Sequence, residues 1–336
     1  MTTIREVAKR LNISITTVSR ALDGYSDVAE DTRGLVIETA HEMGYAPNRA
    51  ARQLRRQRTD TIGYILPASA RQFSDPFFSE FITGLGDEAA FHNFDLVIST
   101  AAPGSDSERH CYEHWVQGRK ADGLVLNRMR LHDWRVQYLA QNNIPFVSLE
   151  RTLDKSDQPY VEVDGRAGFK MLMAYLIAKG HRRIAYIGGP HDLKIQADRF
   201  EGYKQSLEVA GIPFDPELVV DGDTFRGGGY QAGQLLLALK PLPTAITCIN
   251  DLTAIGMLHA ASEQGLKVGH DLAVAGFDGI EDAEHTSPPL TTLRQPLYEV
   301  ARNLVKMLIA SIQKLPLEER RVQFQPELII RESTGG

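Results

Sequence analysis

The chain has 336 residues, of which 43% are hydrophobic and 24% are charged. These values are ordinary for a globular protein, and the length allows two or three domains, so a mainly disordered chain and a disulfide-bonded mini-protein are excluded. The two cysteines are too few for a disulfide framework or a four-cysteine zinc site. There is no apolar run of the ~18 residues that a membrane span needs, and no signal peptide, so we expect a cytosolic protein.

The net charge of −6 is unevenly distributed. Residues 1–60 hold ten basic and eight acidic side chains, a balance of +2, and the rest of the chain holds 27 basic and 35 acidic ones, a balance of −8. Residues 48–58 include five arginines and no acidic residue. Such asymmetry indicates a nucleic-acid partner for the N-terminal part.

The first predicted helix begins after Thr3, which with Glu6 is placed as a capping box. Its apolar residues recur at the spacing of one helix face: Ile4, Val7, Ala8 and Leu11. Asn12 can adopt the left-handed conformation of a tight turn, and Ser14 can cap the next helix. The sequence therefore predicts two short helices joined by a tight turn.

The second helix is predicted over residues 15–22 and a third from about 30 to 43. Their expected inward residues are Val18, Ala21, Leu22, Val36, Ile37, Ala40 and Met43. The second helix leaves a polar set outward: Ile15, Thr16, Ser19 and Arg20. This pattern is typical of a helix-turn-helix whose second helix reads the major groove. A small helical cap without a DNA role would share the periodicity, but the neighbouring arginines favour DNA.

A short helix is also predicted over residues 48–58, where Asn48 can act as its cap. One side carries Ala50, Ala51 and Leu54, and the rest carries Arg49, Arg52, Arg55 and Arg56. Isolated helices of fewer than ~12 residues are marginal in water, so we expect it to fold only against DNA and a second copy of the chain. A solvated linker is the alternative.

From residue 61 onward, short apolar runs alternate with stretches long enough for helices. The predicted strands are residues 61–67, 94–100, 121–126, 144–149, 183–188, 245–249 and 272–277. Buried parallel strands have this appearance. We therefore predict two α/β lobes, each built on a doubly wound sheet.

Ligands of such sheets bind at the carboxyl ends of the strands. Polar and aromatic residues follow several predicted strands: Asp75, Phe78, Arg199, Phe225, Asn250 and Asp278. Paired donors and acceptors beside a flat apolar surface suit a neutral polyol such as a sugar. Singly, Asp and Asn after a strand are more often helix caps.

Three motifs raise the alternative of an enzyme. His110, Glu113 and His114 match a zinc-protease pattern, but the segment is typical of an exposed helix and no distant acidic ligand is evident. Residues 84–89 fit a loose dinucleotide-binding pattern inside a predicted helix, and residues 227–229 lack the Lys-Ser/Thr of a phosphate loop. We therefore expect no catalytic residue, no metal and no cofactor.

The N-terminal blocks resemble the head of the lactose-repressor (LacI/GalR) family of transcription factors. They are residues 4–8, 13–14, 17–24 and 43–54. Further landmarks of the family's effector domain resemble residues 75–78, 179–181, 199–202, 250–251, 276–278 and 290–296. The resemblance thus extends over nearly the whole chain.

The resemblance implies an all-α helix-turn-helix head over residues 1–46, a hinge over 47–59, and a two-lobed α/β domain like the periplasmic binding proteins over 60–336. The implied lobe segments are 60–162 with 292–322, and 163–291 with 323–333. The implied DNA-binding residues are Thr3, Ser14, Ile15, Thr16, Thr17, Ser19, Arg20, Asn48, Arg49, Ala51, Leu54 and Arg55. The implied effector contacts are Asp75, Phe78, Glu150, Arg199, Phe225, Asn250 and Asp278.

The sequence therefore predicts a homodimeric, effector-responsive transcriptional regulator, a repressor that binds a pseudo-palindromic operator. A sugar or glycoside is the expected effector, with a purine or another small molecule as the alternative. The rival classes are a cytosolic sugar-binding protein whose head is only a cap, and a metal hydrolase.

The resemblance places Leu54 where an apolar wedge opens a base step in the minor groove. We therefore expect Leu54→Ala to weaken specific operator binding far more than non-specific binding. Gel shifts with operator DNA and with random DNA of equal length measure both. An equal loss on the two DNAs contradicts the wedge assignment.

Overall fold

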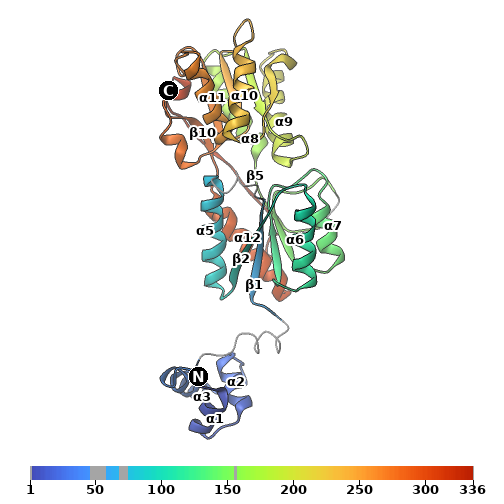
Figure 1. Ribbon diagram of the computed structural model, residues 1–336, viewed down its shortest axis with the longest axis vertical. Coiled ribbons are helices and arrows are strands. Elements are labelled where there is room, and N and C mark those ends of the chain that lie inside the picture. The colour runs from blue at the N-terminus through green and yellow to red at the C-terminus, as the bar shows by residue number, and fades with distance from the viewer. Residues whose placement is uncertain (1, 46–57, 68–74, 155–156, 336) are drawn as a thin grey trace. The chain divides into compact units, whose positions relative to one another are not determined.

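The computed structural model describes residues 2–45, 58–67, 75–154 and 157–335 (Figure 1). Two compact units divide the chain, Met1–Thr59 and Asp60–Gly336. Most of the predicted hinge, residues 47–57, lies outside the described residues. Within the described ranges, no helix is both long and apolar enough to cross a membrane.

The N-terminal unit contains the three predicted helices: α1 (Ile4–Leu11), α2 (Ile15–Leu22) and α3 (Glu30–Glu42). The Glu6 carboxylate accepts the Thr3 backbone N–H at 2.7 Å, which forms the expected capping box. Asn12 has a φ of 53°, in the left-handed region. The Ser14 hydroxyl accepts the Thr17 backbone N–H at 2.9 Å. The local predictions for this turn are confirmed.

A small core joins the three helices of the head. Its fully covered members are Val7, Ala8, Val18, Ala21, Val28, Val36 and Ala40. The prediction that Ile37 points inward is wrong, because its side chain is 51% exposed. Consecutive residues on a helix lie 100° apart, and the face that α1 and α2 cover is the one that carries Val36 and Ala40.

The first lobe is built on a six-stranded sheet in which all neighbours are parallel, in the order β11-β5-β4-β3-β1-β2. Its strands are β1 (Thr61–Pro67), β2 (Asp95–Ala101), β3 (Gly123–Leu126), β4 (Phe146–Leu149), β5 (Tyr160–Val163) and β11 (Arg321–Phe324). Its helices are α5 (Pro76–Phe91), α6 (Asp106–Gln117), α7 (Trp134–Gln141) and α12 (Leu297–Gln313).

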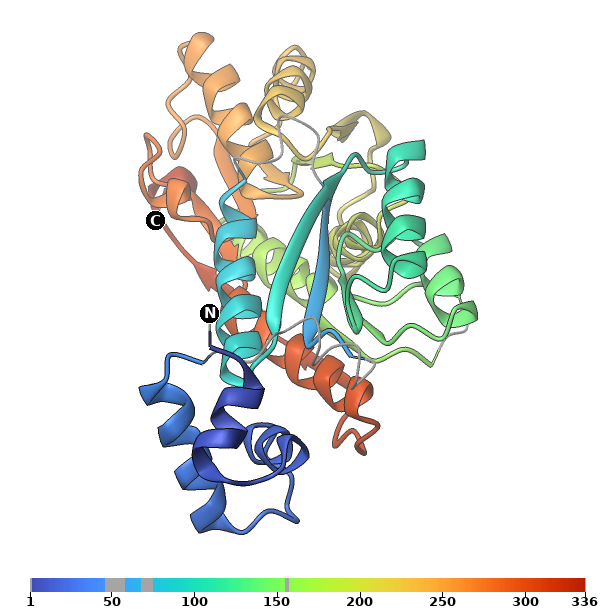
Figure 2. The same cartoon turned by 60° about the horizontal axis from the view of Figure 1, so that its bottom comes forward.

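Helices cover both faces of this sheet. In Figure 1, α5 and α12 lie on one side and α6 and α7 on the other, and the turned view of Figure 2 shows the cyan α5 beside the orange-red α12. Alternate β1 residues accordingly enter two different cores: Ile62 and Tyr64 pack toward α5 and α12, and Ile65 packs toward α6 and α7. The doubly wound prediction is confirmed.

Strand β2 differs from its prediction as a buried strand. It lies at the edge of the sheet, where Val97 is 41% and Ile98 is 38% exposed. An apolar run cannot reveal whether a strand has neighbours on both sides, because that depends on the strand order.

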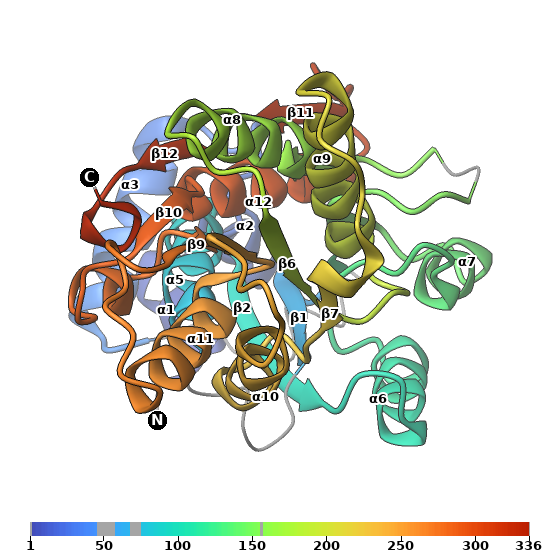
Figure 3. The same ribbon diagram turned by 90° about the horizontal axis from the view of Figure 1, so that it is seen from above.

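The second lobe has a sheet in the order β12-β10-β9-β8-β6-β7, parallel except that β12 runs antiparallel to β10. Its strands are β6 (Ile184–Gly188), β7 (Val219–Asp221), β8 (Ala245–Cys248), β9 (Ala273–Asp278), β10 (Thr291–Arg294) and β12 (Glu327–Ile329). Its helices are α8 (Gly165–Ala178), α9 (Lys194–Val209), α10 (Arg226–Leu237) and α11 (Asp251–Glu263). Figure 3 shows α8 and α9 on one face and α10 and α11 on the other.

The chain crosses between the lobes three times: from β5 to α8, from β10 to α12, and from β11 to β12. Two crossings come later than predicted. Residues 291–294 form a strand of the second sheet, although the predicted boundary put 292–294 in the first lobe. Residues 323–324 still pair with β5 in the first sheet. Strand pairing decides these boundaries, and β5, β7 and β11 are too short and too polar to be found from apolar runs.

Helices α10 and α11 approach each other through glycines. A Cβ atom on Gly256 would lie 2.0 Å from the Arg226 carbonyl oxygen, and one on Gly229 would lie 2.1 Å from the Thr253 carbonyl oxygen. Residues 227–229 thus lie in the first turn of α10, and close packing requires glycine at two of them, Gly228 and Gly229, without a phosphate site.

We expect Gly256→Ala to destabilise the protein, because the backbone of α10 must move away from the new methyl group; overpacking of this kind costs about 1–3 kcal/mol. Gly227→Ala is the matched control, since a Cβ there meets no atom within 4 Å. Thermal unfolding of both variants measures the difference. Equal melting temperatures for Gly256→Ala and the wild type contradict the close packing of the two helices.

Candidate DNA-binding helix and effector cleft

Helix α2 presents the side chains that sequence reasoning placed at base edges. Ile15, Thr16 and Arg20 are exposed. Arg20 forms an ion pair with Asp27, and its guanidinium lies 4.8 Å from the centre of the Tyr25 ring. These contacts hold the arginine beside the helix before any DNA is bound.

The remaining predicted DNA contacts in the head have mixed positions. Thr3 and Ser14 are exposed, and Thr17 is half-buried with its hydroxyl 2.8 Å from that of Ser14. The prediction that Ser19 faces outward is wrong, since only 8% of it is exposed. Ser19 is one of the three buried residues of α2, with Val18 and Ala21, so its small side chain lies within the covered part of the helix. The predicted contacts Asn48, Arg49, Ala51, Leu54 and Arg55 lie outside the described residues.

The second unit contains a cleft at the carboxyl ends of strands from both lobes. It is lined by Asp75, Phe77, Phe78, Asn127, Arg128, Leu149, Glu150, Ile195, Arg199, Thr224, Ile249, Asn250, Asp278 and Gln295. Six of the seven predicted effector residues are therefore brought together. The seventh, Phe225, is partly buried against the core of the second lobe and is not among the lining residues.

Two lining residues also cap helices. The Asp75 carboxylate accepts the Phe77 backbone N–H at 3.1 Å at the start of α5. The Asn250 side-chain oxygen accepts the Thr253 N–H at 3.0 Å and its hydroxyl at 2.6 Å at the start of α11. The Asn250 amide donates to the Thr224 carbonyl oxygen at 3.0 Å. The capping and lining roles thus coincide, and both side chains are held rigidly.

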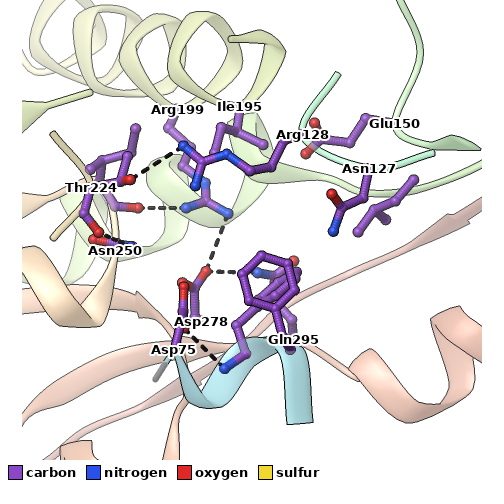
Figure 4. Close-up of a pocket in the computed structure, with 14 residues that line it drawn as sticks. Asp75, Asn127, Arg128, Glu150, Ile195, Arg199, Thr224, Asn250, Asp278 and Gln295 are labelled. Atoms are coloured by element: carbon purple, nitrogen blue, oxygen red, sulfur yellow. Dashed lines mark hydrogen bonds and ion pairs between the residues drawn. The ribbon is translucent and has the colours of Figure 1, made fainter. Parts of the chain in front are cut away.

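Arg199 is the centre of the cleft's polar network (Figure 4). Its Nη1 donates to the Ile249 carbonyl oxygen at 2.5 Å, and its Nη2 donates to Asp278 Oδ1 at 3.5 Å. The guanidinium lies 3.6 Å from the centre of the Phe277 ring, a cation–π contact. Gln295 Nε2 also donates to Asp278 Oδ1, at 2.8 Å. Burial nevertheless raises the pKa of Asp278 to about 7, against the opposing influence of Arg199.

Three buried polar atoms in the cleft have no hydrogen-bond partner among the described residues: Asn127 Oδ1, Glu150 Oε2 and Arg199 Nε. Burial raises the pKa of Glu150 to about 8, although the charge of Arg199 opposes the shift. An unpaired polar atom away from water costs about 1–3 kcal/mol. The three residues line the cleft, so a polar ligand that reaches these atoms would supply the missing hydrogen-bond partners.

Four lining residues other than glycine have a positive φ: Arg128 at 48°, Glu150 at 75°, Thr224 at 70° and Asp278 at 122°. Side chains with a Cβ rarely adopt this region, and a β-branched residue such as Thr224 does so at a cost. Strained backbone of this kind clusters at ligand-binding sites, where surrounding structure enforces it. The concentration of four such residues marks the cleft as a functional site.

Comparison with known proteins identifies the chain. Residues 3–48 match the family model described as bacterial regulatory proteins, lacI family, and residues 173–334 match a periplasmic binding protein-like domain. The transcriptional regulator AglR of Rhizobium meliloti is 34% identical over 99% of this chain and 94% of its own. The chain belongs to the lacI family.

Two solved structures resemble the whole of this lacI-family chain. A complex of the regulator CelR with cellobiose has a TM-score of 0.78 and 30% identity, and covers 99% of this chain and all of its own. A Lac repressor dimer bound to operator and the anti-inducer ONPF has a TM-score of 0.82 and 27% identity, with 99% of each chain covered. The head and two-lobed fold are those of DNA-binding transcriptional regulators.

Family membership agrees with the expectation that the protein is not an enzyme. His110, Glu113 and His114 lie on α6, with the exposed His110 bonded through Nδ1 to the Asp106 carbonyl oxygen at 2.9 Å. Among the residues that the structure describes, no three His, Cys, Asp or Glu side chains are grouped to hold a metal ion. The dinucleotide-like residues 84–89 lie inside α5, away from a strand-to-helix turn.

Several lining residues of this lacI-family cleft were missed from the sequence. Asn127 and Arg128 follow β3 directly, and Gln295 follows β10, so inspection of every strand end finds these three. Phe77 lies beside the predicted Phe78. Thr224 lacked a signal, because the strand before it, β7, has only three residues.

The raised pKa of Glu150 makes the stability of this lacI-family protein depend on pH. Between about pH 4.5 and pH 8 the folded protein keeps a proton that the unfolded chain has lost, so stability falls as pH rises through this range. Glu150→Gln removes the effect. We expect its melting temperature to match the wild type near pH 5 and to exceed it increasingly toward pH 9.

Glu208→Gln, at an exposed position on α9, is the matched control for the pH series. Thermal unfolding of the three proteins without ligand gives the comparison. A constant difference between Glu150→Gln and the wild type from pH 5 to pH 9 contradicts the raised pKa.

Proposed function

We propose that this protein is a cytoplasmic, homodimeric repressor that binds a pseudo-palindromic operator and responds to a sugar or glycoside bound between its two lobes. The observation that carries the proposal is the cleft, where charged and amide side chains of both lobes converge with unsatisfied polar atoms. The same chain holds a helix-turn-helix with an exposed polar face, so ligand binding and DNA binding belong to one molecule.

Exposed residues at the start of α2 support operator recognition. Side chains near the N-terminus of a recognition helix reach base edges in the major groove, and Ile15 and Thr16 have that position here. Arg20 is exposed in the last turn of the same helix. The arginine can donate to guanine, and the threonine and isoleucine can contact the thymine methyl group. A two-fold dimer would place one such helix on each half-site.

The chemistry of the cleft favours a polyol. Hydroxyl groups can donate to Glu150 Oε2 and Asn127 Oδ1, and a hydroxyl oxygen can accept from Arg199 Nε. Phe77 and Phe78 add an aromatic surface that suits the C–H face of a sugar ring. The related CelR structure is a complex with cellobiose, which supports a carbohydrate as the effector of this protein.

The exposed edge strand β2 supports the dimer. Val97 and Ile98 lie on an open sheet edge, and Phe91 at the end of α5 is also exposed. Natural proteins rarely leave an apolar strand edge uncovered in the working state. A second copy is the partner we propose, as in the dimer of the related Lac repressor structure.

Ligand binding is proposed to act as a population shift. A ligand that contacts both lobes favours one degree of closure, and the operator-bound dimer favours one arrangement of its two heads. The effect of ligand on operator affinity must then equal the effect of operator on ligand affinity. Contacts from both lobes to one sugar are therefore the basis of the response.

We expect Arg199→Ala and Asp278→Asn to abolish the ligand response while leaving operator affinity within about twofold, because both residues contact the cleft and not the head. A thermal-shift screen of sugars and glycosides first identifies the ligand, since a compound at 100 times its Kd stabilises by ~2.7 kcal/mol. Gel shifts with the upstream region of the protein's own gene, with and without that ligand, then measure the response.

Lys170→Ala, at an exposed position on α8, is the matched control and should respond like the wild type. A wild-type response in Arg199→Ala or Asp278→Asn would remove that residue from the site. If no sugar or glycoside alters stability or operator binding, the proposed effector class is wrong; if the upstream DNA is not bound at all, the DNA-binding role is wrong.

A further inference from the structure

A second cavity adjoins the cleft and shares Arg128 with it. The first lobe contributes Pro67, Pro103, Gly104, Glu108, Arg128, Arg130 and Arg135, and the second contributes Pro190, Asp192 and Leu193. Three guanidinium groups thus face one cavity. Their hydrogen bonds distinguish a structural arginine from two that can bind a ligand.

Arg135 has a structural role in this cavity. Its Nη2 and Nε donate to the two Asp133 carboxylate oxygens at 2.6 Å and 2.8 Å. The same Nη2 lies within hydrogen-bond distance of the carbonyl oxygens of Asn127 and Arg128, at 3.1 Å and 3.2 Å. The Arg130 N–H donates to Asp133 Oδ2 at 3.1 Å. The Asp133–Arg135 pair therefore fixes the loop that carries the other two arginines, including the left-handed backbone of Arg128.

Arg130 is only partly satisfied. Its Nη2 donates to Glu108 Oε2 at 2.8 Å, and its Nε lies 3.7 Å from Asp192 Oδ2. Its Nη1 is buried and has no partner among the described residues. A guanidinium has five N–H donors arranged for planar oxyanions, so one edge of Arg130 is left for an acceptor.

Arg128 makes one side-chain hydrogen bond among the described residues. Its hydrogen bond to Thr224 Oγ1 is long, 3.4 Å, and joins the two lobes. In the described part of the chain, no carboxylate lies within the 4.0 Å of an ion pair with Arg128. Burial lowers the pKa of its guanidinium, against the more distant charge of Asp75. Arg128 is therefore a half-buried cation without an adjacent counter-charge.

The carboxylates around the cavity do not change this balance. Asp133 is neutralised by Arg135, and Glu108 is bonded to Arg130 and to the Gly104 N–H at 2.9 Å. The Asp192 side chain is 63% exposed, so water screens it. The charge of Arg128 therefore remains without a counter-charge, and both Arg128 and Arg130 have unused N–H donors. A single residue of the loop separates these two arginines.

We propose that Arg128 and Arg130 form an oxyanion subsite beside the cleft, so that the effector is a sugar bearing a phosphate or carboxylate group. This inference rests on the proposed sugar-binding function and specifies its ligand. The sugar ring occupies the cleft around Arg199, and the acidic group extends past Arg128 into the second cavity. A bidentate oxyanion supplies the acceptors that both guanidinium groups lack.

The subsite also lies beside backbone hydrogen bonds that join the two lobes, so an anion bound there can influence lobe closure. Backbone hydrogen bonds join the lobes here, from Leu131 N–H to the Asp192 carbonyl oxygen at 2.7 Å and from Lys194 N–H to the Met129 carbonyl oxygen at 2.9 Å. Arg128 and Arg130 flank the second of these bonds. An anion held by the two arginines is therefore in contact with the segment through which the lobes meet.

The test uses the full chain and three series of ligands, one each for glucose, galactose and mannose. Each series contains the neutral hexose, its 6-phosphate and its uronate. Calorimetry at low ionic strength gives the Kd values, and the phosphate and uronate arms distinguish the two sources of the oxyanion. We expect an anionic member to bind at least tenfold tighter than its neutral parent, which corresponds to about 1.4 kcal/mol. Equal or tighter binding of the neutral sugar overturns the proposal.

Arg130→Gln should remove the anionic preference and leave the affinity for the neutral sugar unchanged. Arg128→Gln is the second variant, because loss of the Glu108 contact could unfold the first. Arg109→Gln is the matched control: this exposed guanidinium stacks on Trp134 at 4.4 Å and does not line the cavity. If both subsite variants keep the preference, or the control loses it, the assignment is wrong.

Inorganic phosphate separates this inference from the proposed function. If no sugar of any charge binds, the proposed effector class fails, but phosphate alone tests the subsite. Phosphate that raises the melting temperature of the wild type and the Arg109→Gln control, but not of the Arg130→Gln and Arg128→Gln variants, supports the oxyanion site. The same phosphate response in all four proteins, or in none, overturns it.

Discussion

Parallel strand direction is the constraint on which the cleft depends. Because parallel strands of one sheet end at the same edge, the residues that follow them gather there, and in this chain the edges of two sheets contribute to one cleft. Charged and amide side chains in that position are withdrawn from water and need partners. The structure supplies them through helix caps at Asp75 and Asn250 and through the Arg199 network.

The hydrogen-bond partners within the cleft do not satisfy all of its polar groups, and this determines how the cleft can bind a ligand. Glu150 and Asp278 have pKa values of about 8 and about 7 because burial outweighs the nearby arginine. Each therefore changes charge near neutral pH and can meet a hydroxyl donor as a carboxylate or an acceptor as a carboxylic acid. Both residues have a positive φ, which the surrounding structure must enforce. A ligand that supplies hydrogen-bond partners for these groups therefore binds with a favourable free energy.

The head differs from the cleft, because short-range interactions within the chain define the ends of its helices. The Thr3–Glu6 capping box, the left-handed Asn12 and the Ser14 cap each depend on residues no more than three positions apart. Such features can be predicted from sequence, and all three were. The errors at Ile37 and Ser19 have another origin, since each depends on which helix covers which part of its neighbour.

The sequence by itself determined the helices of the head, most of the buried strands, and the polar residues at strand ends that became the cleft. Apolar periodicity and capping interactions involve residues only a few positions apart, so they can be recognised from the sequence without knowledge of the fold. Only the tertiary structure decided that β2 is an exposed edge, that Phe225 packs against the core of the second lobe, and that Thr224 and Arg128 meet across the lobes. These facts depend on strand order and on contacts 96 residues apart along the chain, which no local pattern encodes.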